Sequence, residues 1–399
     1  METPPHPEGS ATEVLLAFLR LGCLSFGGPI AHLGYLHTEF VERRRWCSEE
    51  AFAELVAIAQ SLPGPASSQV VFALGLVRAR FAGAFAAWAA FTLPSALLML
   101  AFALGHPLLI GRTGSGILHG LQIVAVAIVA QAVFTMQRSL APDAPRLAIA
   151  LLAAATALIA PTAIATLAAI LFGAILGAAF LPRIQNADQF HLPFTISRCM
   201  GFIAATLFFL LLLLPFAATG SRTLAVFSAF YRTGALVFGG GHVVLPLLEQ
   251  AVVAPGWVDQ TVFLAGYGAT QAVPGPLFTF AAFLGASIRP SPSPLLLSAL
   301  SLVAIFLPGL LLMVAVLPFW STLRENARLQ SSLRGVNASV VGVLFAAFLH
   351  PVITTALHSV ADIVLAVAAL LALIRFKLAP WIVVLVSVLL ATIGTIIHH

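Results

Sequence analysis

Two arginines, Arg20 and Arg232, lie inside apolar segments, and a pair of glycines follows each of them closely. A guanidinium in such a segment is costly, and its planar fork of N–H donors matches an oxyanion. Farther along, each copy of this pattern carries a tryptophan and the motif Gln-x-x-Pro-Gly-Pro, at spacings that agree to one residue. The matching positions are Gly27, Gly28, Trp46 and 60–65 in the first copy, and Gly239, Gly240, Trp257 and 271–276 in the second. This internal duplication indicates an anion site.

Glycine and proline break the apolar segments of each copy. Glycine permits backbone conformations that are closed to other residues, and Pro29 is suited to the first position of a new helix. A helix that restarts within the membrane offers unpaired N–H groups and its positive dipole end to an anion. Pro65 repeats this arrangement, with Ser67, Ser68 and Gln69 in the first turn as further donors. The predicted substrate-binding residues are Arg20, Gly27, Gly28, Pro29, Gln60, Pro63, Gly64, Pro65, Ser67, Ser68, Arg232, Gly239, Gly240, Gly241, Gln271, Pro274, Gly275 and Pro276.

Some of these residues have a second interpretation. Arg20 lies two turns from the start of its segment and has the length to snorkel to the membrane interface. An equivalent arginine in both copies is poorly explained by two independent snorkels, so we favour the anion role. Gln60 and Gln271 are expected either to donate to the anion or to hydrogen-bond the carbonyls that the broken helix frees.

Three other polar residues lie near the motifs. Glu54 is a candidate for carrying a coupled proton, but pairing with an arginine or exposure at the interface is the favoured interpretation. His32 and His242 follow the two glycine pairs without aligning with each other, so a shared metal or proton-relay role is not expected. We predict neither a metal site nor a cofactor. No motif of ATP hydrolysis is present.

The composition predicts an all-α polytopic membrane protein. Of the 399 residues, 60% are hydrophobic and 8% are charged. The three cysteines are too few and too scattered for a disulfide framework or a zinc site. The sequence pI of about 9.7 comes from arginines strung along membrane connections, so it indicates topology and not a nucleic-acid partner.

About 10 to 13 hydrophobic segments are expected, of which the duplicated ones are too short to span a bilayer alone. Two short segments that are separated by a glycine or proline break, which we call a broken pair, therefore form either one interrupted span or a re-entrant hairpin. The segment 199–219 has no counterpart in the first half, and an unpaired span between two repeats inverts the second repeat relative to the first. Long segments are expected at 83–105, 117–137, 199–219, 295–318, 335–350, 357–374 and 378–397. The segments 147–160 and 162–180 are expected to form one tight helical hairpin.

The distribution of basic residues favours the hairpins. If the broken pairs are re-entrant, fourteen basic residues share one face and three lie opposite; if each pair is one full span, the split falls to eleven against six. The larger bias agrees better with the positive-inside rule, and both arrangements put the amino terminus in the cytoplasm. The fourteen are Arg43, Arg44, Arg45, Arg78, Arg80, Arg138, Arg146, Arg183, Arg198, Arg324, Arg328, Arg334, Arg375 and Lys377, and the three are Arg112, Arg222 and Arg289.

At these motifs the sequence closely resembles the chromate ion transporter family, in its long two-domain form. The resemblance rests on 19–33, 39–46, 62–69, 91–95, 238–242 and 271–276, and it covers essentially residues 12–350. It implies two oppositely oriented homologous domains and an inner-membrane secondary transporter that exports chromate, driven by the proton motive force, as in chromate resistance. The second half departs mildly, with Gly241 for Pro29 and 277–279 for 66–68, which puts equal contact of both halves with substrate in doubt.

The expected domains are a first repeat at 1–180, a linker with an extra span at 181–222 and a second repeat at 223–399. Alternative functions are an importer of sulfate or another anion and a passive anion channel. An enzyme is not expected, because neither paired membrane carboxylates nor a metal-ligand cluster is present. The expected partners are chromate, or sulfate as a similar dianion, and the lipid bilayer, with a homodimer as one oligomeric state.

Overall fold

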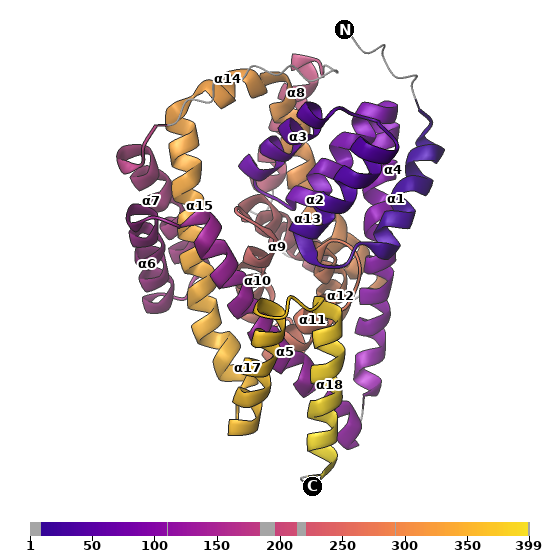
Figure 1. Cartoon of the computed structure of the whole chain (residues 1–399), viewed down its shortest axis with the longest axis vertical. Coiled ribbons are helices and arrows are strands. Elements are labelled where there is room, and N and C mark those ends of the chain that lie inside the picture. Colours follow the sequence, from indigo (N-terminus) through magenta and orange to yellow (C-terminus); the bar gives the residue numbers. More distant parts are fainter. Residues whose placement is uncertain (1–8, 110, 184–195, 214–220, 292, 398–399) are drawn as a thin grey trace.

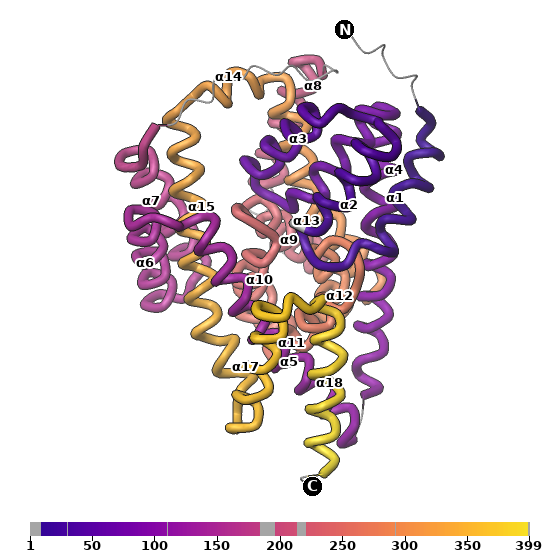
Figure 2. Tube along the Cα trace, in the orientation of Figure 1, coloured from indigo at the N-terminus to yellow at the C-terminus, as the bar shows by residue number. Residues whose placement is uncertain are grey.

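The computed structural model describes residues 9–109, 111–183, 196–213, 221–291 and 293–397, and within these ranges every regular element is helical. Six helices are long and apolar enough to cross a membrane, and five shorter ones are also apolar. The predicted all-α polytopic membrane protein is confirmed. The chain begins at the top of Figure 1 and ends at the bottom, and Figure 2 traces the same path.

The first broken pair is a hairpin. Helix α1 (Ala11–Leu24) is followed by α2 (Gly28–His37), which continues as the π-helix η1 (Thr38–Arg43). The ring of Phe18 on α1 stacks on that of Phe40 on η1, with centroids 4.5 Å apart. The chain therefore runs along α1, breaks near Gly27 and returns along α2 and η1 beside α1.

The second broken pair also turns back. Helix α3 (Glu49–Ser61) begins at Ser48, whose hydroxyl accepts from the N–H of Ala51. Helix α4 (Ala66–Gly105, extended by the 3-10 turn η2, His106–Leu108) has non-helical backbone at Ala79 and Arg80. A Cβ added to Gly75 would meet the carbonyl oxygen of Gly83 at 2.4 Å. Eight residues of continuous helix would separate them by about 12 Å, so α4 folds back on itself at Ala79.

The outer ends of these first hairpins gather at one place. Arg78, at the end of the first part of α4, pairs with Glu13 of α1 at 3.1 Å. Its guanidinium also lies 5.2 Å from the ring centroid of Trp46, which precedes α3. We call this region the N-terminal end of the molecule. Since the outer ends of all four half-helices lie there, each pair turns back at its break as a hairpin and does not continue through the molecule as one interrupted helix.

The second half builds a matching set of hairpins. A cluster around Trp257 corresponds to the cluster of Glu13 and Arg78 around Trp46. The Arg222 guanidinium lies 4.3 Å from the Trp257 ring centroid, and the backbone N–H of Arg289 donates to the Trp257 carbonyl. Both copies contain a π-helix at the same place. The elements are α9 (Arg222–Leu236), η4 (Gly241–Val243), α10 (Val244–Leu248), the π-helix η5 (Glu249–Val253), α11 (Gln260–Thr270), η6 (Leu277–Thr279) and α12 (Phe280–Ser287).

Helix α13 relates the two sets in space. It runs over Pro294–Val316, about 34 Å at 1.5 Å per residue. Its far end leads through η7 (Leu317–Phe319) to α14 (Trp320–Glu325), which contacts α3 near the N-terminal end. The second hairpins precede the start of α13, so they open toward the opposite end of the molecule.

One long helix of each half packs against a helical hairpin of the other half. The hairpin of α6 (Ala144–Ile159) and α7 (Ala163–Phe180) packs against α15 (Ala327–Ala347). The hairpin of α17 (Val360–Ile374) and α18 (Pro380–Ile397) packs against α5 (Gly111–Leu140). Figure 1 shows the first pair flanking α15 and the second low in the molecule. The remaining elements are α8 (Arg198–Leu213), η8 (Phe348–Ile353) and α16 (Thr354–Ala356).

The connection between α17 and α18 differs from the expected topology. Arg375 and Lys377 were expected at the same face as Arg43, but Trp381 in the first turn of α18 lies 6.1 Å from Phe26, at the first break. The two helices have 15 and 18 residues, and they reach from the far end only to the level of the break. Within the expected linker and extra span, residues 184–195 and 214–220 lie outside the described residues, and the second gap includes the end of the predicted span 199–219.

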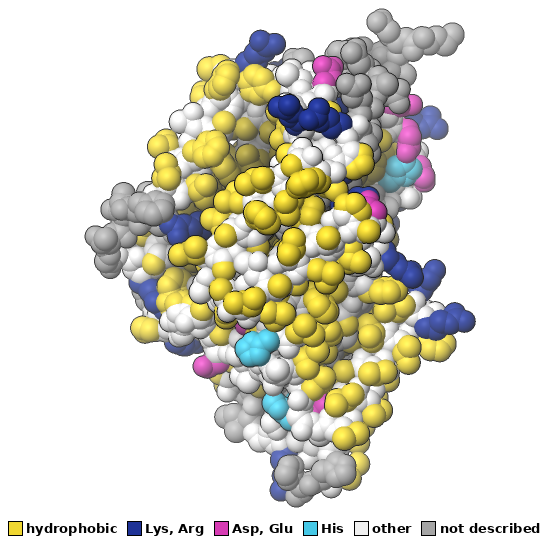
Figure 3. Space-filling view, turned by 90° about the vertical axis from the view of Figure 1, so that its left-hand side faces the viewer, with side chains coloured by type: hydrophobic (Ala, Val, Ile, Leu, Met, Phe, Trp, Pro, Cys, Tyr) yellow, Lys and Arg dark blue, Asp and Glu magenta, His cyan; other side chains and the backbone are white. Residues whose placement is uncertain are grey.

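The surface agrees with a lipid environment. In the face that Figure 3 shows, hydrophobic side chains cover the middle, and charged ones gather toward the top and the edges. The outward faces of the peripheral helices carry large apolar side chains, such as Leu151 at 56% and Leu389 at 59% exposure. Burial of these side chains in lipid removes them from water.

Candidate functional site

Helices that start at the four central breaks have no side-chain cap. The residues that precede them are Gly27, Pro65, Gly240 and Pro276, and none of these offers a side-chain oxygen. Eight helices that start elsewhere are capped by a side chain, although α11 and α14 are not. The capping residues are Ser10, Ser48, Asp143, Thr162, Ser221, Ser293, Asn326 and Ser359. First-turn N–H groups have no carbonyl partner within their own helix. The central starts therefore leave these donors for another partner.

The predicted glycines supply the backbone that the breaks require. Gly27 and Gly28 have φ of +106° and +78°, and Gly239 and Gly240 have +74° and +137°. These conformations are strained for residues with a Cβ. The chain then restarts as predicted, with Pro29 in the first turn of α2 and Gly241 at the start of η4.

Reciprocal backbone hydrogen bonds bring the breaks of the two halves together. The N–H of Gly64, in the first Pro-Gly-Pro, donates to the carbonyl of Val237 at 2.7 Å. The N–H of Gly275, in the second, donates to the carbonyl of Ser25 at 2.8 Å. Ser25 and Val237 occupy the same position before their glycine pairs. Each Pro-Gly-Pro is thus held against the glycine break of the other half.

The same two glycines approach the opposite half closely. A Cβ on Gly64, at φ +116°, would meet the Cα of Gly309 at 3.0 Å. A Cβ on Gly275, at φ +102°, would meet the Oγ of Ser95 at 2.7 Å. Gly309 and Ser95 each follow a Leu-Pro pair within a helix, in α13 and α4 respectively. The Pro-Gly-Pro motifs therefore require glycine both for conformation and for space.

Around the first break the side chains are polar. His32 on α2 is buried and donates from Nε2 to the Ser25 carbonyl at 3.0 Å, the same oxygen that accepts from Gly275. In the neutral ring the other nitrogen, Nδ1, is an acceptor, and the Ser67 hydroxyl lies 3.5 Å from it. His32 thus joins α2, the start of α4 and the second Pro-Gly-Pro.

The start of α4 carries polar atoms with unused hydrogen-bonding capacity. Ser68 is fully buried, and its hydroxyl has no hydrogen-bond partner within the described residues. Gln69 donates from Nε2 to the carbonyls of Pro63 and Gly309, at 2.9 and 3.1 Å, while its Oε1 has no partner there. Buried polar groups in native proteins are nearly always hydrogen-bonded, so these atoms are available to a ligand.

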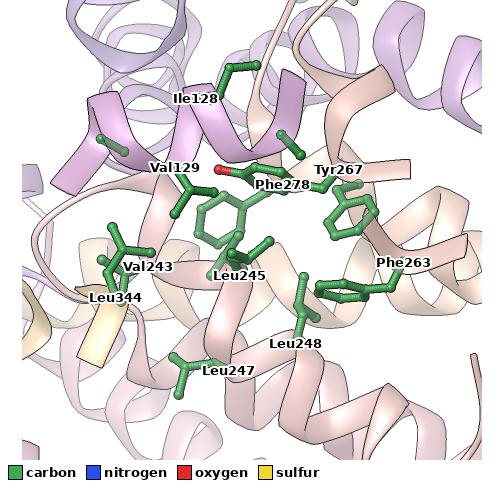
Figure 4. Packing of buried hydrophobic residues seen from close by; sticks show 14 of the residues in the cluster. Ile128, Val129, Val243, Leu245, Leu247, Leu248, Phe263, Tyr267, Phe278 and Leu344 are labelled. Atoms are coloured by element: carbon green, nitrogen blue, oxygen red, sulfur yellow. The ribbon is translucent and has the colours of Figure 1, made fainter. Parts of the chain in front are cut away.

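Around the second break the corresponding side chains are apolar. Val244, Phe278 and Phe280 replace His32, Ser67 and Gln69, counted from the shared motifs. Figure 4 shows Phe278 and Tyr267 packed with Val243 and Leu245, in contact with residues of α5. His242 is bonded to the Tyr267 hydroxyl at 2.8 Å, and Thr279 donates its hydroxyl to the Pro276 carbonyl. The second break is a packed core rather than an open polar site.

The arginines and glutamines predicted for the site have separate surroundings. Arg20 is exposed and lines a groove beside α1, whereas Arg232 is half-buried and does not line that groove. Gln60 is exposed, and the buried Nε2 of Gln271 has no partner within the described residues. Gln60 was considered for a hydrogen bond to a carbonyl of the break, but Gln69 is the residue that makes this bond.

Glu54 is paired with an arginine, which confirms the favoured interpretation. Arg324 of α14 donates to both carboxylate oxygens, at 2.8 and 2.9 Å, and the Trp320 indole donates to Oε1 at 2.5 Å. Glu54 is 7% exposed. This buried contact joins α3 of the first half to the second half at the N-terminal end.

Sequence reasoning missed several residues of the centre. His32 was considered only for a shared relay, and Ser25, Ser95 and Gly309 were not assigned a role. Ser25 and Gly309 carried one usable signal each, since they adjoin a Gly-Gly or a Leu-Pro break. Their partners come from the other half of the chain, more than 200 residues away, which no local pattern reveals.

Apolar helices that break and meet at a buried centre define a polytopic membrane protein with an internal polar site. The sequence matches the chromate transporter family over residues 12–178 and again over 224–393. The chain belongs to this family, which indicates a transporter rather than an enzyme.

Curated relatives share most of its length. It is 30% identical over 343 residues to a probable chromate transport protein of Synechococcus elongatus, covering 85% of this chain and 84% of that one. It is 29% identical over 385 residues to a chromate transport protein of Cupriavidus metallidurans, covering 93% and 90%. A chromate transport protein of Pseudomonas aeruginosa is 28% identical over 343 residues, covering 85% and 80%. No solved structure matches the chain.

Proposed function

We propose that this protein exports chromate across the bacterial inner membrane, driven by the proton motive force, and binds the dianion at the central helix starts. The observation that carries this proposal is the set of uncapped helix starts, held together by the reciprocal bonds of Gly64 and Gly275. Such starts supply N–H donors and the positive end of the helix dipole. Family membership supports chromate as the ion.

The start of α4 is the proposed principal contact. Its first turn presents backbone N–H groups, and the buried Ser68 hydroxyl is an unused donor beside them. A dianion in a site of low dielectric gains more from such donors than it would in water. The other predicted residues at the breaks, Gly28, Pro29, Gly240, Gly241 and Pro276 among them, shape the space around it.

The two halves are proposed to be inverted repeats, at 1–180 and 223–399, with 181–222 as linker and extra span. The hairpins of the two halves open toward opposite ends of the molecule, and their breaks exchange equivalent hydrogen bonds. A site between inverted repeats suits alternating access, because the same contacts can rearrange toward either side. A homodimer is the proposed assembly.

The amino terminus is proposed to lie in the cytoplasm. Arg375 and Lys377 are set aside, and so are Arg138 and Arg146, because Leu140 between them lies against Gly239 of the second break. Ten of the basic residues counted above then remain assigned to the N-terminal end, against Arg112, Arg222 and Arg289 at the other. Basic residues concentrate on the cytoplasmic side of inner-membrane proteins.

Labelled chromate uptake into everted membrane vesicles tests the function directly. An exporter accumulates chromate in these vesicles when respiration energises them, and a protonophore abolishes the accumulation. Vesicles without the protein are the background, and excess sulfate measures selectivity. Flux that only follows the chromate gradient would indicate a channel, and accumulation in right-side-out vesicles instead would indicate an importer.

A further inference from the structure

A groove of about 680 Å³ runs between α1 and the α2–η1 helix of the first hairpin. Arg43 and Glu39 lie on its η1 side, and Ser25, which directly precedes the first break, lines it from α1. Arg20 lines it between these levels. Its remaining lining residues are Leu21, Leu24, Ala31, Gly34, Tyr35 and Thr38.

The groove carries a net positive charge. Glu39 is buried and already accepts from both Arg43 and Arg44, at 2.7 Å each. Arg20 makes no ion pair with any residue that the structure describes, and its side chain is exposed to the groove. A guanidinium that has no carboxylate partner is available to an oxyanion, to which it can donate two parallel hydrogen bonds.

Ser25 joins the groove to the centre of the molecule. It is 1% exposed, yet its hydroxyl has no hydrogen-bond partner within the described residues. Its carbonyl accepts from Gly275 and from His32, so its backbone is part of the meeting point of the two halves. The groove therefore leads from the N-terminal end to the first break.

Gly34 leaves the groove open on its α2 side. A Cβ built on this helical glycine meets nothing within 4 Å. The second half offers no such space: Pro246 and Leu247 replace Gly34 and Tyr35, both are buried, and Val237 replaces Ser25. The residues that open and line the groove are thus not repeated at the matching positions of the second half.

We infer that this groove is an anion vestibule, in which Arg20 and Ser25 bind the oxyanion transiently between the N-terminal end and the central site. The inference rests on the proposed function, because it gives that function a route of access. It assigns Arg20 to entry rather than to the central site, since Arg20 faces the groove and not the start of α4. It also predicts that access from this side depends on the first half only.

Filling the groove tests the inference. Gly34→Phe places a ring in open space without a backbone clash, and Gly394→Phe is the matched control, because Gly394 is another helical glycine with nothing within 4 Å. We expect Gly34→Phe to lose chromate transport at normal membrane abundance and thermal stability, Gly34→Ala to keep most of it, and Gly394→Phe to match wild type. Normal transport by a stable Gly34→Phe protein would overturn the inference.

Cysteine labelling gives a readout that does not depend on transport. Tyr35→Cys is made in a background with Cys23 and Cys199 changed to serine; Cys47 remains, since burial first, and Glu49 second, raise its pKa to about 12. An anionic methanethiosulfonate should react about tenfold faster than a cationic one, because Arg20 concentrates anions. Chromate should slow this reaction, and Arg20→Gln should remove the preference.

No reaction, as expected for a groove filled by lipid, or faster reaction with the cation would overturn the vestibule. If wild type moves no chromate while the anionic preference persists, the proposed function fails and the vestibule does not.

Discussion

The two central breaks have nearly the same backbone and very different side chains. Both use a Gly-Gly pair and a Pro-Gly-Pro with positive φ, and both exchange a backbone bond with the other half. His32, Ser67 and Ser68 surround the first, whereas Val244 and Phe278 fill the second, and Thr279 bonds its own backbone. The two halves thus share the backbone geometry of the breaks, whereas the buried polar atoms without partners lie mainly in the first half.

The helices that start at the two Pro-Gly-Pro motifs also differ between the halves. The first Pro-Gly-Pro leads directly into the α-helix of α4, while the second leads into the 3-10 turn η6. The parallel dipoles of an α-helix add along its axis and give a stronger positive end than a single 3-10 turn followed by a short helix. We therefore assign the anion mainly to the first half, and the following changes test that difference.

The largest effect is expected from removing a break. Replacement of Pro63, Gly64 and Pro65 by alanine should abolish transport, because a continuous helix satisfies its own N–H groups and leaves none for the dianion. The same triple change at 274–276 should reduce transport less. Chromate uptake and equilibrium binding by purified protein measure both effects.

Membrane insertion must be confirmed for both triple variants. Gly64→Ala and Gly275→Ala are each expected to destabilise the protein, because the added Cβ meets the Cα of Gly309 at 3.0 Å in one and the Cβ of Ser95 at 3.1 Å in the other. Equal, normal transport by both triple variants would show that the breaks serve packing only.

Neutralising the arginines should have the next largest effect. Arg20→Gln is expected to abolish transport at near wild-type abundance, and Arg20→Lys should keep part of it, since the charge remains and the bidentate fork is lost. Arg232→Gln should be milder, because Arg232 does not line the groove. Normal transport by Arg20→Gln would instead support snorkelling.

Loss of the buried carboxylate should affect stability more than anion affinity. Glu54→Gln leaves Arg324 partly buried without its counterion, and breaking such a pair typically costs about 3 kcal/mol. Chemical unfolding in detergent should show this loss, while Glu50→Gln, at an exposed position in the first turn of the same helix, should show a much smaller one. Unchanged stability together with a lost pH dependence of transport would favour the proton-carrying role.

The smallest effect on chromate binding is expected from removing single hydroxyls, at two equivalent positions of the two halves. Ser68→Ala should weaken chromate binding about tenfold, since a hydrogen bond to a charged group contributes about 1.5 kcal/mol or more. Thr279→Ala should change binding less than about twofold, because its hydroxyl is already used by the Pro276 carbonyl. Equal losses from both changes would mean that the two halves contact the anion alike.

Local patterns were sufficient to predict much of the protein. Apolar composition predicted the membrane class, and Gly-Gly and Pro-Gly-Pro predicted the breaks, because backbone conformation depends on the residue itself and its neighbours. Short segments and the arginine distribution favoured hairpins over single interrupted spans, and the contacts of Arg78 with Glu13 and Trp46 agree with that prediction.

Only the tertiary structure decided which polar groups lie at the centre. Gln69 bonds Gly309, Ser25 accepts from Gly275, and Glu54 pairs with Arg324, and each partner is 240 or more residues away in the chain. The level of the α17–α18 connection was likewise set by packing on α5 and not by the charge of Arg375. Partners that meet through folding leave no spacing in the sequence, so the breaks were predictable and their contacts were not.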